Sequence, residues 1–110
     1  MSLTQQTCVP CQGGIPPLTP EEASGFLDQV PGWELNDASD RLYRKFPFDD
    51  FVAALAFVNK VGAVAEEEGH HPDISFGWGH ADIVLFTHKI QGLHENDFIM
   101  AAKISELGQE

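Results

Sequence analysis

The sequence predicts a single α+β domain in which three helices cover one face of a four-stranded antiparallel sheet. Helix signals and pairs of short apolar strands follow one another in the order α-β-β-α-β-β-α, which is the main observation behind this prediction. The length of 110 residues suits one hydrophobic core. With 43% hydrophobic and 21% charged residues, the composition is typical of a folded globular protein.

The first half of the chain predicts a helix followed by a β-hairpin. The run Thr19-Pro20-Glu21-Glu22 offers an N-cap, a proline suited to the first helical turn and a glutamate that can close a capping box. The helix is expected to continue to about Val30, where a Pro-Gly pair follows. Residues 33–35 and 41–46 flank a segment rich in turn-forming residues, so we expect them to pair as two short strands.

A long second helix is predicted from about Phe51, with Asp49 and Asp50 in the places of an N-cap and a first-turn carboxylate, and with Gly69 as its C-terminal cap. Its side chains are apolar on nearly all sides, because Asn59 and Lys60 are the only polar residues between positions 51 and 65. More than one face of this helix must therefore be covered. We expect the sheet to cover one face and a second copy of the chain to cover another, giving a homodimer or homotetramer.

The last third of the chain predicts a second hairpin and a third helix. Apolar residues alternate along residues 73–78, and a strand at residues 81–88 is apolar on both faces, as in a strand that is central or covered twice. Glycines between the two strands indicate a turn, with His80 on its surface. The third helix follows Gly92-Leu93 and runs to Leu107.

The charge of the chain argues against nucleic acids and membranes as partners. Seventeen acidic residues outnumber six basic ones, so the formal net charge is −11 and phosphate groups are repelled. Apolar runs are too short to span a bilayer, and the N-terminus lacks a basic start followed by an apolar segment. We therefore expect a cytoplasmic protein that binds no nucleic acid and no membrane.

The N-terminal segment differs from the rest of the chain. Residues 1–17 show no helix or strand periodicity and are expected to form a flexible or loosely docked arm, whereas residues 18–110 form the folded domain. Cys8 and Cys11 are the only cysteines, and their C-x-x-C spacing suits half a zinc site or a redox pair. A structural zinc site needs four ligands and a thioredoxin-type site needs a βαβ context. Neither follows in the sequence, so no catalytic role is expected for this pair.

Histidines provide the strongest chemical signal. The chain contains five, and His70, His71 and His88 are expected to meet at one end of the sheet. Pro72 disfavours helix at the residue before it, so the two adjacent histidines lie at a corner between helix and strand. The hairpin that follows returns the chain to the same level at His88. Corners of this kind hold functional side chains on a rigid scaffold.

Three imidazoles in one pocket favour general acid–base catalysis, because the pKa of free histidine lies near neutral pH. A metal site is the alternative, with Glu66 four residues before His70 as a further ligand. The helix signature His-Glu-x-x-His is absent, so we expect no metal and assign Glu66 and Asp97 to orienting an imidazole. Trp78 is expected either in the core or in the pocket wall.

These residues together resemble a known family signature. Their spacing and types are similar to those of the pterin-4a-carbinolamine dehydratases, and the resemblance extends from about Leu18 to Leu107. The signature positions are, in order, Glu66, His70-His71-Pro72, Trp78, His88 and Asp97, with three, five, nine and eight residues between them.

The resemblance implies a hydro-lyase that uses no metal or organic cofactor. Members of this family dehydrate 4a-hydroxytetrahydropterins to quinonoid dihydropterins, which recycles the pterin that aromatic amino-acid hydroxylases use. By position, His70 and His88 match the acid–base histidines, and His71 matches the residue that holds the pterin. The positions with a binding or supporting role are Glu66, Pro72, Trp78 and Asp97. One departure is His94, where the family usually has Thr or Ser as the cap of the third helix, and this implies a weaker cap.

Two other classes of function remain open. A binding module on the same fold is the main alternative, since family relatives act as a dimerisation cofactor of a transcription factor and as assembly factors of a carbon-fixing enzyme. The presence of all three pocket histidines favours the enzyme, because a scaffold has no need of them. A metal-binding or redox protein that uses Cys8, Cys11 and histidines is the third class.

Overall fold

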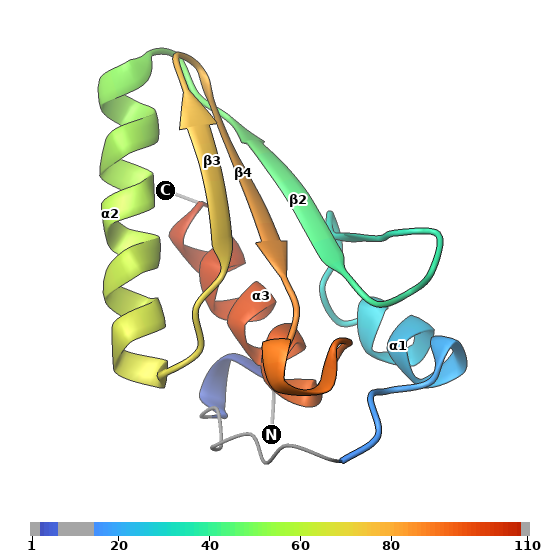
Figure 1. Cartoon of the computed structure of the whole chain (residues 1–110). Coiled ribbons are helices and arrows are strands. Elements are labelled where there is room, and N and C mark those ends of the chain that lie inside the picture. The colour runs from blue at the N-terminus through green and yellow to red at the C-terminus, as the bar shows by residue number, and fades with distance from the viewer. Residues whose placement is uncertain (1–2, 7–14, 109–110) are drawn as a thin grey trace.

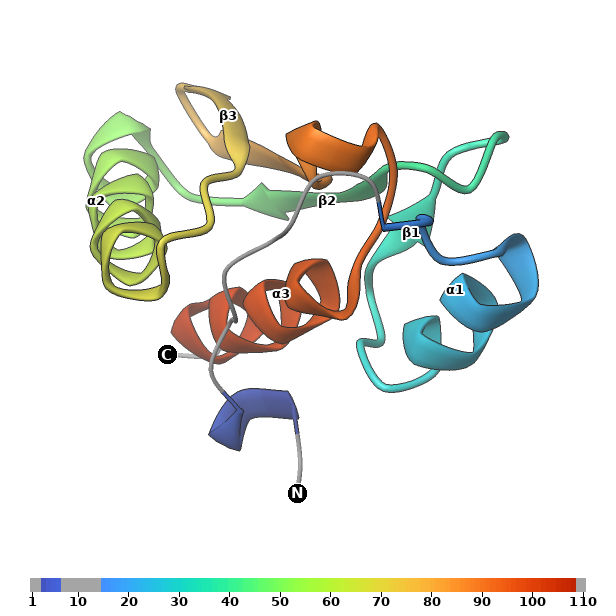
Figure 2. The same cartoon turned by 60° about the horizontal axis from the view of Figure 1, so that its bottom comes forward.

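The computed structural model describes residues 3–6 and 15–108, which fold as the predicted α+β domain. Four antiparallel strands form one sheet in the order β1-β2-β4-β3, and α3 lies beneath it between α2 and α1 (Figure 1, Figure 2). The elements in chain order, with η for a short 3-10 helix, are η1 (Leu3–Gln5), α1 (Pro20–Leu27), β1 (Glu34–Leu35), β2 (Leu42–Pro47), α2 (Phe51–Glu68), β3 (Asp73–Gly77), β4 (His80–Leu85), η2 (His88–Ile90) and α3 (Glu95–Leu107).

Helix α1 begins as the sequence predicts and ends earlier. Thr19 Oγ1 accepts a hydrogen bond from the Glu22 backbone N–H at 3.2 Å, and the Glu22 carboxylate accepts one from the Thr19 N–H at 2.9 Å, which completes the capping box. After Leu27 the backbone tightens, because the N–H of Val30 donates to the Leu27 carbonyl three residues back. Pro31 disfavours helical geometry at Val30, which explains the early end.

The first strand of the first hairpin is shorter than predicted. β1 contains two residues, because the side chain of Asn36 turns the chain directly after it. Its Oδ1 accepts hydrogen bonds from the backbone N–H groups of Asp40 and Arg41 at 2.9 and 2.8 Å. Trp33, which was expected in this strand, lies just before it. Its indole is buried and donates to Ser105 Oγ of α3 at 2.8 Å.

Helix α2 buries one face and leaves another exposed. Asp50 caps its start by accepting a hydrogen bond from the Ala53 N–H at 2.9 Å, and Gly69 ends it in the left-handed conformation, with φ 66°. The residues packed into the core are Ala54, Phe57, Val61 and Ala65. The large apolar residues left in solvent, 44%, 74% and 38% exposed, are Phe51, Val52 and Leu55. The chain itself covers only part of the apolar surface, and cover by a second copy stays a prediction.

The second hairpin gives β4 the central place that its apolar character predicts. β4 pairs with β2 on one side and with β3 on the other. The prediction that this strand continues to His88 is wrong, because β4 ends at Leu85. Beyond it, the backbones of Thr87 and Gly92 exchange hydrogen bonds of 2.8 and 3.5 Å, which close the small loop that contains η2. His88 is thus the first residue of a 3-10 turn.

Helix α3 provides much of the core. Its largest buried apolar residues are Phe98, Ile99, Met100 and Ile104. Phe98 stacks on Phe26 of α1, with ring centroids 5.2 Å apart. At the helix start, His94 Nδ1 accepts a hydrogen bond from the Asn96 N–H at 3.0 Å, and the Asp97 carboxylate accepts one from the His94 N–H at 3.0 Å. A ring nitrogen of His94 therefore fills the capping role that a hydroxyl oxygen usually has.

The described part of the N-terminal arm packs against α3. Leu3 is buried, and Lys103 Nζ of α3 donates a hydrogen bond to the Thr4 carbonyl at 3.2 Å. The same ammonium group lies 3.6 Å from Glu68 Oε2 at the end of α2, so it links three parts of the chain. This part of the arm is attached to the core rather than loosely docked.

Three further expectations concern the cysteine pair, metal binding and membrane spans. Cys8 and Cys11 lie outside the described residues. Within residues 3–6 and 15–108, no group of three or more His, Cys, Asp or Glu side chains is close enough together to hold a metal ion. Of the helices in the same ranges, none is long and apolar enough to cross a membrane.

The cap at His94 can be tested by substitution. We predict that His94→Ala lowers the free energy of unfolding by about 1 kcal/mol, because the start of α3 then loses a side-chain acceptor. His94→Thr restores an acceptor and should stay within about 0.5 kcal/mol of the wild type. Urea denaturation followed by circular dichroism measures both variants. Equal stability of the alanine variant and the wild type would show that the cap contributes nothing.

Candidate active site

Two stretches of the chain that are distant in sequence, one around residues 66–73 and one around residues 87–97, meet at one end of the sheet. The C-terminal end of α2, the start of β3, the η2 turn and the start of α3 all lie at the lower end of the molecule in Figure 1. Antiparallel pairing explains this, because Asp73 at the start of β3 lies opposite Val84 near the end of β4. The link between α2 and β3 carries His70 and His71, and η2 begins with His88. The three histidines therefore lie at the same end of the sheet.

A buried carboxylate holds His70. Nε2 of His70 lies 2.6 Å from Oδ1 of Asp97, and the two side chains are 11% and 0% exposed. The other oxygen of Asp97 accepts hydrogen bonds from Thr87 Oγ1 at 2.9 Å and from the His94 N–H at 3.0 Å. Because Asp97 engages Nε2, Nδ1 is the ring nitrogen of His70 that is left for chemistry.

Asp97 also connects distant parts of the site. It belongs to the first turn of α3, where its carboxylate completes the capping box with His94. Through Thr87 the same carboxylate reaches the residue directly before His88. One buried group therefore links the segment after α2, the segment before η2 and the start of α3. This fixes the backbone that carries His88 relative to the ring of His70.

His71 is paired in a more exposed place. Its Nε2 lies 2.5 Å from Oε2 of Glu66 in the last turn of α2, and the two side chains are 60% and 78% exposed. The metal-site alternative required Glu66 and His70 to share one helix face, and the structure instead pairs Glu66 with His71. α2 ends at Gly69, whose left-handed backbone carries His70 to α3 and leaves His71 beside the helix.

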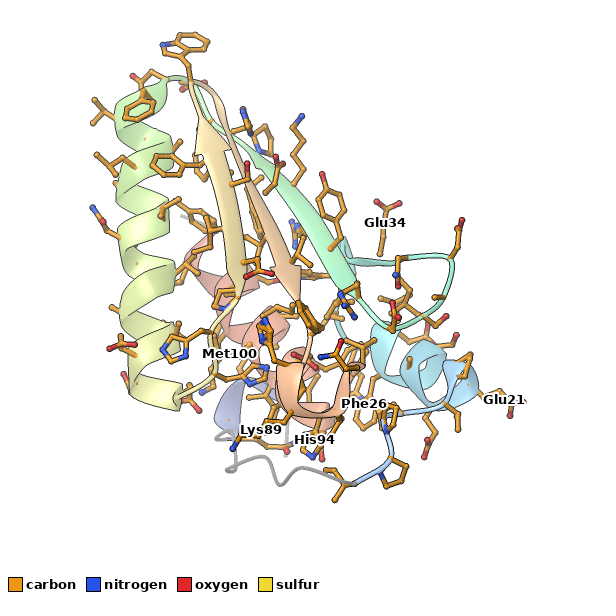
Figure 3. All side chains as sticks on the ribbon, viewed as in Figure 1. Glu21, Phe26, Glu34, Lys89, His94 and Met100 are labelled. Carbon is orange, nitrogen blue, oxygen red and sulfur yellow. The ribbon has the colours of Figure 1, made fainter. Side chains whose placement is uncertain are left out.

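His88 is supported by an aromatic ring. The residue is exposed at the start of η2, and its imidazole lies against Phe86, with ring centroids 4.1 Å apart and an angle of 49° between the ring planes. The next residue, Lys89, is labelled at the lower end of the molecule in Figure 3. No role was predicted for Phe86 or Thr87 from the sequence. Their position directly before His88 is the signal that could have identified them.

Two residues considered in the sequence lie away from the histidines. Trp78 is in the turn between β3 and β4 and is 73% exposed, so the expectation that it lies in the core is wrong, and its place in the pocket wall stays a prediction. The five residues of β3, about 17 Å of extended chain, separate it from the link that carries His70. His80 begins β4, with Nδ1 3.3 Å from Oδ2 of Asp82. Pro72, by contrast, lies in the histidine-bearing link itself.

Comparison with known proteins identifies relatives of this chain. Residues 16–107 match the family described as pterin 4 alpha carbinolamine dehydratase. A protein of Methylococcus capsulatus whose name assigns it to the pterin-4-alpha-carbinolamine dehydratases is 61% identical, over 99% of this chain and 96% of its own length. A protein of Halorhodospira halophila with a name of the same kind is 56% identical, over 98% of this chain and 99% of its own length.

Solved structures with the same fold confirm the architecture. The crystal structure of a transcriptional coactivator/pterin dehydratase from Brucella melitensis superposes with a TM-score of 0.79 at 32% identity, covering 84% of this chain and 98% of that one. A pterin dehydratase-like protein identified as a RuBisCO assembly factor in the α-carboxysome gives a TM-score of 0.62 at 26% identity, covering 72% of this chain and 92% of that one. Proteins of this fold thus carry names that refer to catalysis and to assembly.

The two carboxylates that contact histidines should differ in their effect on stability. We predict that Asp97→Ala lowers the free energy of unfolding by about 3 kcal/mol or more, because it leaves buried donors without an acceptor. Glu66→Ala, the matched control on an exposed pair, should cost less than about 1 kcal/mol. Urea denaturation of both variants provides the comparison. Similar losses in the two variants would contradict the structural role assigned to Asp97.

Proposed function

Because this chain belongs to the pterin-4a-carbinolamine dehydratase family, we propose that it removes water from a 4a-hydroxytetrahydropterin by histidine acid–base catalysis. The observation that carries the mechanism is the buried Asp97, which holds the ring of His70 and, through Thr87, the segment that leads into His88. The product is a quinonoid dihydropterin. We propose that this reaction returns the pterin to aromatic amino-acid hydroxylases in the cytoplasm.

The reaction needs two proton transfers. The bond between C4a and the hydroxyl oxygen breaks when a proton is delivered to that oxygen, and a proton leaves the ring nitrogen next to C4a, so that water and the quinonoid dihydropterin are formed. Two imidazoles in opposite protonation states can perform both transfers. This balance requires no oxidant, no reductant and no external cofactor, and we propose that the protein uses neither a metal nor an organic group.

The contacts of each histidine suggest its role. When Nε2–H of His70 is donated to Asp97, Nδ1 carries the lone pair, so His70 suits the group that accepts the proton of the ring nitrogen. His88 then suits the donor to the leaving hydroxyl. The exposed pair of His71 and Glu66 lies at the outer edge, where it can hold the pterin as it enters.

A binding role without catalysis is the second candidate. The observation that favours it is the exposed apolar start of α2, where Phe51, Val52 and Leu55 face solvent. The name of the assembly factor with the same fold points in the same direction. The occupant that we propose for this surface is a second copy of the chain, because a closed symmetric assembly is the common way to cover such a face.

Kinetics of single variants can test the acid–base assignment. We predict that His70→Ala and His88→Ala each lower kcat by about 10²–10⁴-fold, because each removes a proton-transfer group. His71→Ala should mainly raise KM, because a holding group acts in the ground state and the transition state alike. Stopped-flow measurement on chemically generated 4a-hydroxytetrahydropterin gives both constants. If the first two variants changed KM alone, the assignment would be wrong.

Light scattering can test the proposed homo-oligomer. We predict that Val52→Glu reduces the mass of the assembly without loss of folding, because an unpaired carboxylate is strongly disfavoured in an apolar interface. Val58 and Val64 of the same helix are partly buried against the hydrophobic core of the domain, so they are less suitable positions for this test. Ser24→Glu on α1 carries the same charge change and should leave the mass unchanged. A wild-type mass near 12.1 kDa would overturn the proposal.

A further inference from the structure

The ring of His88 is held in a different way from the other two imidazoles. Asp97 fixes His70 and Glu66 contacts His71, each through a ring nitrogen. Within residues 3–6 and 15–108, no hydrogen bond reaches the ring of His88. Its ring contact is with Phe86, with centroids 4.1 Å apart and the ring planes tilted by 49°. An exposed side chain on a short turn otherwise has several rotamers available.

Phe86 is itself held by a cation. The guanidinium carbon of Arg41 lies 3.6 Å from the centroid of the Phe86 ring, which is well within the range of a cation–π interaction. Arg41 is anchored in the β1–β2 turn, because its backbone N–H donates to Asn36 Oδ1 at 2.8 Å and its Nη1 donates to the Asp40 carbonyl at 2.9 Å. A continuous series of contacts therefore leads from this turn through Arg41 and Phe86 to His88.

We propose that Arg41 and Phe86 are positioning residues for His88. The guanidinium fixes the plane of the phenyl ring, and the phenyl ring fixes the orientation of the imidazole. An acid–base group must be held close to its productive geometry, and displacement by about 1 Å can reduce the rate by about 10²-fold. The inference rests on the proposed function, in which His88 donates the proton to the leaving hydroxyl. It assigns a part in catalysis to a turn that lies outside the family signature.

The chain provides its own control for a general effect of losing a cation–π pair. Arg44 lies over the ring of Phe46, with its guanidinium carbon 4.4 Å from the ring centroid. This pair packs toward Ser105 of α3, to which Arg44 donates a hydrogen bond at 3.1 Å, and neither residue contacts a histidine of the site. Arg41→Gln and Arg44→Gln therefore each remove one positive charge and one cation–π contact, the first in the β1–β2 turn and the second in β2.

The kinetic experiment compares these variants. We expect Arg41→Gln and Phe86→Leu to lower kcat between about 3-fold and 100-fold with KM little changed, because the position of a proton donor matters most in the transition state. Arg41→Lys and Phe86→Tyr keep a cation and a ring, and should recover most of the rate. Arg44→Gln should leave kcat unchanged. Equal kcat in the wild type, Arg41→Gln and Phe86→Leu would overturn the proposal.

A second measurement does not depend on turnover. Nuclear magnetic resonance of the His88 Cε1–H group reports the ring current of Phe86, and Phe86→Leu should remove that contribution to its chemical shift. Arg41→Gln should move the signal in the same direction, whereas Arg44→Gln should not. An unchanged signal in Arg41→Gln would exclude positioning through Phe86, even if Phe86→Leu fails to fold. If the wild type shows these chemical-shift changes but has no dehydratase activity, the proposed function is rejected and the positioning contact is retained.

Discussion

The buried carboxylate of Asp97 is the group on which the histidine end of the molecule depends. A carboxylate removed from water is costly unless other donors replace the hydrogen bonds it made there. Asp97 obtains them from His70, Thr87 and the backbone N–H of His94. These donors belong to three segments, of which the one with His70 is distant in sequence from the other two. The segments must meet for the carboxylate to be satisfied, and the same meeting brings the histidines to one end of the sheet.

The three histidines are held in different ways, and these differences fit the roles proposed for them. His70 is almost buried and has a carboxylate partner with no exposure, so its ring has little freedom. His88 has a ring contact but no ring hydrogen bond among the described residues. His71 and its partner Glu66 are both largely exposed. A group that holds an incoming ligand can tolerate an exposed position of this kind, whereas a group that accepts a proton at a defined atom must be held more closely.

The sequence predicted the elements better than the side-chain partners. A cap such as Thr19 is decided by neighbours a few residues away, so the start of α1 could be read directly from the chain. The partner of Glu66 could not. Helical spacing favoured His70, but the left-handed backbone of Gly69 ends the helix and gives Glu66 the neighbouring His71 instead. The sequence predicted Gly69 as the cap that ends this helix, but a predicted cap does not report which imidazole then turns toward the core.

The position of Trp78 changes how the family signature should be interpreted. The signature joins it to the histidines, yet the structure places it in the β3–β4 turn, near the opposite end of α2, whose 18 residues span about 27 Å. Exposed apolar residues gather at that end, where Phe51 also packs against Phe76 with ring centroids 5.4 Å apart. The histidines and the apolar surface therefore occupy different ends of one small domain. The presence of the histidines favours catalysis, but it carries no weight against a binding role, because a partner at the apolar end would leave the histidine end free.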